Sequence, residues 1–95
     1  MNYKQFIWDE NKYRLNKRKH GITFDEASTV FDDIHAIYMP DPDHSEDEER
    51  FIVLGYSKKN RLLIVCHCYR ENDTMIRIFS ARKATPQEHK DYGGV

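Results

Sequence analysis

Apolar and polar residues alternate over three stretches of the C-terminal half, and this alternation predicts β-strands. The three stretches are 50–57, 61–70 and 76–84. Polar turn residues separate them, with Lys59-Asn60 in the first gap and Glu71-Asn72-Asp73 in the second. Two further strands are predicted over 3–8 and over 34–39, the latter stopped by Pro40. The strand pattern therefore dominates the chain.

Strong end signals predict a basic helix over 10–20. Asp9 is a good N-cap, and Gly21 is placed to end the helix in a left-handed conformation. Five Lys or Arg but only one acidic residue lie between these ends. The basic surface is either a solvated face or one that steers phosphate or an acidic partner, and the sequence leaves both interpretations open.

Two capping boxes predict two more helices. In the first, Thr23 is the N-cap and Glu26 the third helical residue, and the apolar stripe of the helix that follows is expected in the core. In the second, Thr85 is the N-cap and Glu88 closes the box of a short helix that ends at about Tyr92.

This order of elements predicts a single α+β domain over residues 1–95. Two N-terminal helices are expected to pack on an antiparallel sheet of four to five strands, and a short helix follows at the C-terminal end. A chain of 95 residues is near the lower size limit for one hydrophobic core. We therefore expect one domain rather than a multidomain protein.

The turns also predict which strand residues lie opposite each other. A three-residue loop over 71–73 places Arg70 opposite Thr74 and His67 opposite Arg77. If Lys58 lies opposite Arg61, one face of the sheet collects the apolar side chains for the helices to cover. Those residues are Phe51, Val53, Ile64, Cys66, Cys68, Ile76 and Ile78. The other face then carries His67 and Arg77.

Charge is divided unevenly along the chain, although the net charge is only −1. Residues 1–50 carry seven Lys or Arg against twelve Asp or Glu, a balance of −5, whereas residues 51–95 carry eight against four, a balance of +4. Most of the acidic excess lies in 41–49, which is expected to be a solvated loop. The C-terminal half is the expected site for an anionic ligand.

The two cysteines indicate a reduced, cytoplasmic protein. Cys66 and Cys68 are two residues apart in one strand, a spacing that suits small core residues better than a disulfide. A metal site that includes His67 is the alternative, but strand alternation places this histidine on the opposite face. No apolar stretch is long enough to cross a membrane, and no secretion signal is visible.

Paired cations at the end of the last predicted strand suggest phosphate chemistry. Arg77, Arg82 and Lys83 place three positive charges within seven residues, next to the capped helix. In the predicted register a titratable imidazole, that of His67, faces one of these fixed cations. This pair is the candidate catalytic centre.

On four segments in the same order, the chain resembles the BrnT family of bacterial toxins. The segments are Phe6–Lys12, His20–Ala27, Glu49–Ser57 and Arg77–Ala84, and the match that contains them covers nearly the whole chain. The resemblance implies a RelE-like fold and a small ribonuclease encoded in a type II toxin–antitoxin operon. It also implies a BrnA-type antitoxin that neutralises the toxin and binds operator DNA, so that the toxin meets this DNA only indirectly.

The resemblance further implies which residues carry out the chemistry. RNA cleavage without a metal ion needs a base for the 2′-hydroxyl, positive charge near the phosphorus and an acid for the 5′-oxygen. His67 is expected as base or acid, while Arg77 and Arg82 stabilise charge. Six residues are expected to contact RNA: Lys12, Tyr69, Arg70, Ser80, Lys83 and Tyr92. No cofactor and no metal ion are expected.

Two other functions stay open at this point. One is a non-catalytic binding module that holds an antitoxin-like protein on its sheet face. The other is an enzyme that acts on a different phosphate-bearing small molecule. Incubation with RNA in the presence of EDTA separates these possibilities from a metal-independent ribonuclease.

Overall fold

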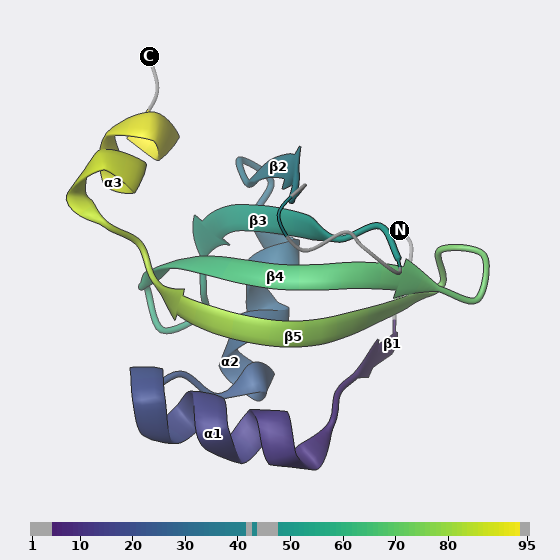
Figure 1. The fold of residues 1–95 in the computed structure, drawn as a ribbon. Helices are drawn as coiled ribbons and strands as arrows, with labels where there is room; N and C mark the ends of the chain where they lie inside the picture. Colours follow the sequence, from purple (N-terminus) through teal and green to yellow (C-terminus); the bar gives the residue numbers. More distant parts are fainter. Residues whose placement is uncertain (1–4, 42, 44–47, 94–95) are drawn as a thin grey trace.

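A five-stranded sheet with helices on both faces organises the described part of the chain, in the computed structural model of Figure 1. The structure describes residues 5–41, 43 and 48–93. The strands are β1 (Gln5–Ile7), β2 (Ile37–Pro40), β3 (Phe51–Tyr56), β4 (Leu62–Arg70) and β5 (Met75–Lys83). Tyr3 and Lys4, which were expected in the first strand, lie outside the described residues.

The sheet order is β1-β5-β4-β3-β2. The pairs formed by β2, β3, β4 and β5 are antiparallel, as expected, whereas β1 runs parallel to β5 at one edge. The parallel pair arises because the chain crosses from β1 through the helices and the other strands before it forms β5. The α+β fold predicted from the sequence is confirmed.

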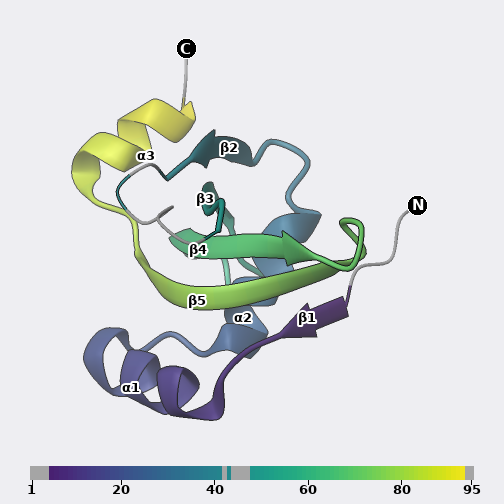
Figure 2. The ribbon, with the colours of Figure 1, turned by 45° about the vertical axis from the view of Figure 1, so that its right-hand side comes forward.

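The first helix has the ends that the sequence predicts. α1 spans Glu10–His20, and the Asp9 carboxylate caps it by accepting a hydrogen bond from the Lys12 backbone N–H at 3.0 Å. Gly21 ends the helix at φ 71°, a conformation that costs glycine little. α1 lies alongside β5, on the opposite side of the molecule from α3 in both views (Figures 1 and 2).

The second helix is short and continues as a 3₁₀ turn. α2 spans Phe24–Ser28, and η1 spans Thr29–Asp32. The Thr23 hydroxyl caps α2 by accepting from the Glu26 backbone N–H at 3.1 Å. The Glu26 carboxylate does not return to the cap, because it accepts hydrogen bonds from Arg61 and from the Ser57 hydroxyl. This helix start is therefore tied to the β3–β4 turn.

The third helix, α3 (Pro86–Gly93), begins with a complete capping box. The Thr85 hydroxyl accepts from the Glu88 backbone N–H at 3.2 Å, and the Glu88 carboxylate accepts from the Thr85 N–H at 2.8 Å. No helix among the described residues has the length and apolar character needed to cross a membrane.

The main core lies between the sheet and α1, α2 and η1. Its fully buried members from the helical side and from the sheet are Ile22, Phe24, Ala27, Val30, Val53, Leu63, Val65, Ile76, Ile78 and Ala81. A smaller cluster on the opposite face contains Leu54, Leu62 and Ile64, and Tyr92 of α3 packs against it. The sheet is therefore covered fully on one face and partly on the other.

The predicted register between β3 and β4 is wrong by one residue. Phe51 lies opposite His67, and the Ser57 backbone N–H donates to the Arg61 carbonyl at 2.9 Å. The turn therefore has three residues rather than two, and Asn60 closes it with φ 61°. Asparagine tolerates this left-handed conformation better than most residues.

The predicted register between β4 and β5 is also wrong. Arg70 lies opposite Met75, so the loop has four residues, and Arg77 lies opposite Cys68 instead of His67. Farther along, an irregularity between Cys66 and His67 shifts the register again. The predicted pairing of His67 with Arg77 therefore does not exist.

These two shifts turn β4 over relative to the prediction. His67 lies opposite Ile78 on the helix-covered face, and Val65 lies opposite Val53 there. Cys66 and Cys68 point to the other face rather than to the main core predicted for them, although Cys68 is buried there, with an exposed fraction of 1%. Both cysteines are free thiols, as expected.

Candidate functional site

A hollow of about 400 Å³ lies on the partly covered face of the sheet, beside the β4–β5 irregularity. It brings together three of the residues expected to contact substrate, namely Lys12 of α1 and Ser80 and Arg82 of β5. Arg50 and Asp41, which were not among the predicted site residues, also line it. We call this hollow the Arg50–Arg82 cleft.

Arg82 enters the cleft from β5 and is held by α3. Both of its terminal nitrogens donate to the Glu88 carboxylate, at 2.8 and 3.0 Å. Hydrogen bonds from this guanidinium lower the pKa of Glu88 to about 2. The pair orients Arg82 at the rim of the cleft, next to Ser80, whose side chain is exposed.

Arg50, the residue just before β3, extends its side chain into the cleft. Its guanidinium lies over the Phe79 ring, with the central carbon 3.9 Å from the ring centroid. Arg77 approaches the same ring at 5.9 Å, so the structure places Arg77 on this face but apart from His67. The sequence offered a signal for Arg50, because it begins the predicted strand over 50–57, in which alternation gives it the same face as Ile52.

Asp41 supplies a buried carboxylate, which corrects the prediction that this residue belongs to a solvated loop. Its exposed fraction is 6%, and its backbone N–H donates to the Arg50 carbonyl at 2.9 Å. The Cys66 thiol lies 3.5 Å from its carboxylate. Burial raises the pKa of this thiol to about 11, so Cys66 stays protonated. Asp43 is exposed, whereas 42 and 44–47 lie outside the described residues.

His67 is buried in the main core and does not lie beside Arg77, the arrangement that its predicted catalytic role requires. The residue has an exposed fraction of 0%, and the nearest neighbouring ring, that of Phe31, has its centroid 4.8 Å away. Nδ1 lies 3.1 Å from the Val65 carbonyl, and Nε2 lies 3.3 Å from the Tyr69 hydroxyl. A neutral ring with its proton on Nδ1 satisfies both contacts. Burial lowers the pKa of His67 to about 4.

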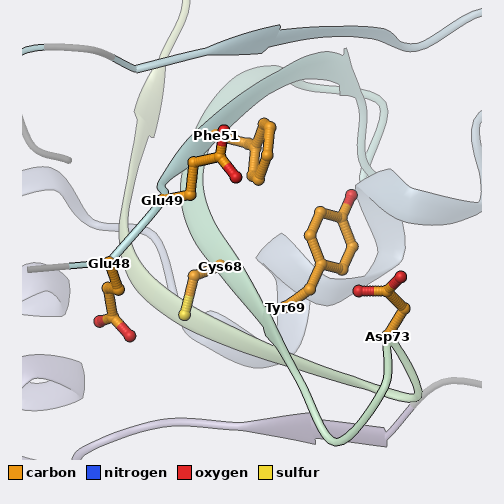
Figure 3. A pocket seen from close by; sticks show the side chains of 6 residues that line it. All are labelled: Glu48, Glu49, Phe51, Cys68, Tyr69 and Asp73. Atoms are coloured by element: carbon orange, nitrogen blue, oxygen red, sulfur yellow. The ribbon is translucent and has the colours of Figure 1, made fainter.

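Tyr69 lies in a separate, acidic hollow of about 550 Å³ (Figure 3). Its ring is 5.4 Å from that of Phe51, and the carboxylates of Glu48, Glu49 and Asp73 line the same hollow. Arg70, another residue expected to bind RNA, donates to Glu48 at 2.8 Å. Three carboxylates disfavour a phosphate here, so this larger hollow is the weaker candidate for an RNA site.

The last two residues expected to contact RNA lie away from the cleft lining. The Tyr92 hydroxyl donates to the Asp33 carboxylate at 2.6 Å, and this bond raises the pKa of Tyr92 to about 12. Lys83 is exposed on β5 opposite Leu63. Tyr92 thus joins α3 to the sheet rather than offering a free ring, and Lys83 lines none of the hollows described above.

Comparisons with known proteins show the family to which this chain belongs. A family model described as "Ribonuclease toxin, BrnT, of type II toxin-antitoxin system" matches residues 8–88. The crystal structure of the Brucella abortus ribonuclease toxin, BrnT, is similar in fold, with a TM-score of 0.67, 23% sequence identity, and coverage of 86% of this chain and 97% of that one. No curated protein matches the chain. Because the family model spans most of its length, this protein belongs to the BrnT family of ribonuclease toxins of type II toxin–antitoxin systems.

Proposed function

We propose that the Arg50–Arg82 cleft is the site where this toxin cleaves RNA, by acid and base chemistry that needs no metal ion. The observation that carries the proposal is the convergence of two guanidinium groups, one ammonium group and one hydroxyl on a single hollow beside a buried carboxylate. Such a set of charges suits a phosphodiester, because a guanidinium has five N–H donors, so Arg82 can keep its contact with Glu88 and still donate to a phosphate oxygen.

The reaction is a transesterification within the RNA strand. The 2′-oxygen attacks the adjacent phosphorus while its proton moves to a base, and the bond from phosphorus to the 5′-oxygen breaks. The departing 5′-oxygen takes a proton, which leaves a 2′,3′-cyclic phosphate and a 5′-hydroxyl. Arg50 and Arg82 stabilise the extra negative charge on the phosphorane, the step at which preorganised cations contribute most.

Two groups in the cleft can transfer protons. We assign the Asp41 carboxylate as the base and the Lys12 ammonium as the acid, since both line the hollow that holds the arginines. His67 has no part in this assignment because the sheet separates it from the cleft. The expected catalytic role of His67 stays a prediction, and its burial favours a structural role.

The partner is proposed to be a BrnA-type antitoxin, because a type II toxin is paired with an antitoxin. We place the toxin in the cytoplasm, where RNA and a newly made antitoxin are both present. Contact with operator DNA is proposed to occur only through that antitoxin.

The decisive experiment incubates antitoxin-free protein with labelled RNA in EDTA. Arg50→Ala and Arg82→Ala are each expected to reduce the cleavage rate by about a hundredfold to a thousandfold, the cost of removing one preorganised donor. Arg18→Ala is the matched control, because Arg18 is exposed on α1 and lines none of the hollows described above. Circular dichroism checks that each variant is folded.

Three results would contradict parts of the proposal. If the folded wild-type protein cleaves no RNA, with or without ribosomes, this result contradicts the catalytic function and favours the non-catalytic binding module. Cleavage that EDTA abolishes and Mg²⁺ restores refutes metal independence. Equal losses in Arg18→Ala and Arg82→Ala refute the location of the site.

A further inference from the structure

A second, smaller hollow continues the Arg50–Arg82 cleft toward α1. It measures about 210 Å³ and lies between α1 and β5. Lys12, Phe79 and Ser80 line both hollows, so the two meet at these residues. We call this second hollow the α1 groove. A polymer bound in the cleft that continues past Ser80 therefore enters the α1 groove.

A buried side chain holds the walls of the α1 groove at a fixed separation. Asn16 of α1 has an exposed fraction of 6%, and its amide nitrogen donates to the Ala81 carbonyl at 2.8 Å. The Ala81 N–H donates back to the amide oxygen at 3.0 Å. Because both bonds join the middle of α1 to β5, the groove is formed before any ligand binds.

Cationic and apolar side chains of α1 face the groove in one stripe. Lys12, Leu15 and Lys19 are three, four or seven residues apart, and this spacing places them on the same side of a helix. Leu15, which lies between the two lysines in this stripe, is 62% exposed and offers an apolar contact to a ligand. The described residues that line the groove include no carboxylate.

Helix-end electrostatics explains only part of this arrangement. Cations in the last turn, such as Lys17 and Lys19, favour the negative end of the helix dipole wherever they point. That effect does not account for Lys12, which lies in the first turn. Lys17 lies about 140° around the helix from Lys12, on a different side from the groove.

We propose that the α1 groove is a binding subsite for single-stranded RNA next to the scissile phosphate, an inference that rests on the proposed function of the cleft. Lys12 and Lys19 neutralise backbone phosphates, and Leu15 contacts a base or sugar. Phe79, at the junction, presents an aromatic side chain to the unpaired bases that pass it. The substrate class is thus an unpaired RNA strand that extends beyond the cleavage point.

RNA fits this groove better than an acidic protein does. Because the groove meets the cleft at Ser80, a strand held at Arg50 and Arg82 can extend directly into the groove, whereas a protein partner needs no such connection. A groove with cations at intervals and one apolar contact also suits a repeating phosphate backbone with bases between the phosphates.

The test compares the affinities of a short and a longer RNA strand for the protein. Uncleavable 2′-O-methyl oligonucleotides, one short enough for the cleft alone and one several nucleotides longer, are titrated against wild type, Lys19→Ala and Lys17→Ala. Lys19→Ala is expected to reduce the advantage of the longer strand by about threefold to tenfold and to lower the salt slope by about one. With a cleavable strand, the loss should appear in KM rather than kcat.

The matched control separates the possible outcomes. Lys17→Ala removes the same charge from the same helix, so an equal loss in both variants would overturn the subsite. Loss of antitoxin binding with no change in RNA affinity in Lys19→Ala would reassign the groove to a protein. If the longer strand binds as expected but wild type cleaves no RNA, the proposed catalysis fails while the groove stands. Normal cleavage with no effect of Lys19→Ala refutes the groove alone.

Discussion

A single buried histidine shows how residue type and environment differ as guides to function. His67 is a good general acid or base by type, but its ring contacts the Val65 carbonyl and the Tyr69 hydroxyl inside the main core. Both ring nitrogens are thereby satisfied when the ring is neutral. Protonation would add a charge in an apolar site, which is why the pKa falls to about 4.

This depressed pKa predicts that the protein loses stability in mild acid. The unfolded chain binds a proton at His67 below about pH 6.5, whereas the folded protein excludes it until about pH 4. The free energy of unfolding should therefore fall by about 2 kcal/mol between pH 7 and pH 5 through this residue. Urea titrations at these pH values measure the fall.

The His67→Gln variant is the control for that titration. It retains hydrogen-bonding groups but cannot titrate, so its stability should depend less on pH even if it is lower overall. The other histidines contribute equally to both proteins and cancel in the comparison. Identical pH slopes for the two proteins would show that His67 is not the group responsible.

At the scale of elements, helix ends were predictable from the sequence and strand registers were not. The ends of α1 depend on Asp9 and Gly21, which act on their own neighbours. The register of β4 depends on two loops, each of which is one residue longer than predicted. Because side chains alternate with a period of two, one-residue shifts placed His67 and the cysteines on the wrong faces.

The same limit explains which residues of the candidate cleft were predicted from the sequence. Arg82, Ser80 and Lys12 were recognised by type and by family resemblance, and the cleft does bring them together. Asp41 was missed because the acidic segment between β2 and β3 has no regular pattern, whereas Arg50 begins an alternating stretch whose pattern offered a signal that was not used. Only the folded structure shows that the Asp41 backbone pairs with Arg50 and that the Asp41 side chain is buried.

The side-chain amide of Asn16 joins α1 to β5, and its loss is predicted to lower the free energy of unfolding strongly. Asn16→Ala removes the partners of the Ala81 N–H and carbonyl groups in a buried site, which should lower the free energy of unfolding by about 2–4 kcal/mol. Asn11→Ala, on the exposed side of the same helix, should change it by less than about 0.5 kcal/mol. Denaturation curves give both values.

Hydrogen exchange tests whether Asn16→Ala destabilises the protein at the contact between α1 and β5. The Ala81 amide should exchange faster in Asn16→Ala, because its acceptor on α1 is gone. Equal stability of the Asn16→Ala and Asn11→Ala proteins would mean that α1 is held by apolar contacts alone. The walls of the groove would then not depend on this amide.

For the whole molecule, folding places opposite charges side by side. The acidic and basic halves of the sequence, at −5 and +4, meet at the cleft, where Asp41 and Asp43 of the first half lie with Arg82 of the second, and Arg50 of the first half adds another cation. A net charge near zero therefore conceals a strong local field. The buried Asp41 serves the proposed chemistry, but the exposed Asp43 is expected mainly to repel phosphate.

Removing that repulsion should strengthen RNA binding. Asp43→Asn is expected to raise the affinity for a single-stranded oligonucleotide by about twofold to fivefold at low salt, and the gain should vanish near 0.5 M salt because exposed charges are screened. Asp91→Asn makes the same change of charge on α3, outside the described lining of the cleft, and should have little effect. If both variants gain equally, net charge governs binding. A gain confined to Asp43→Asn would mean that the local field at the cleft decides how strongly an acidic protein holds RNA.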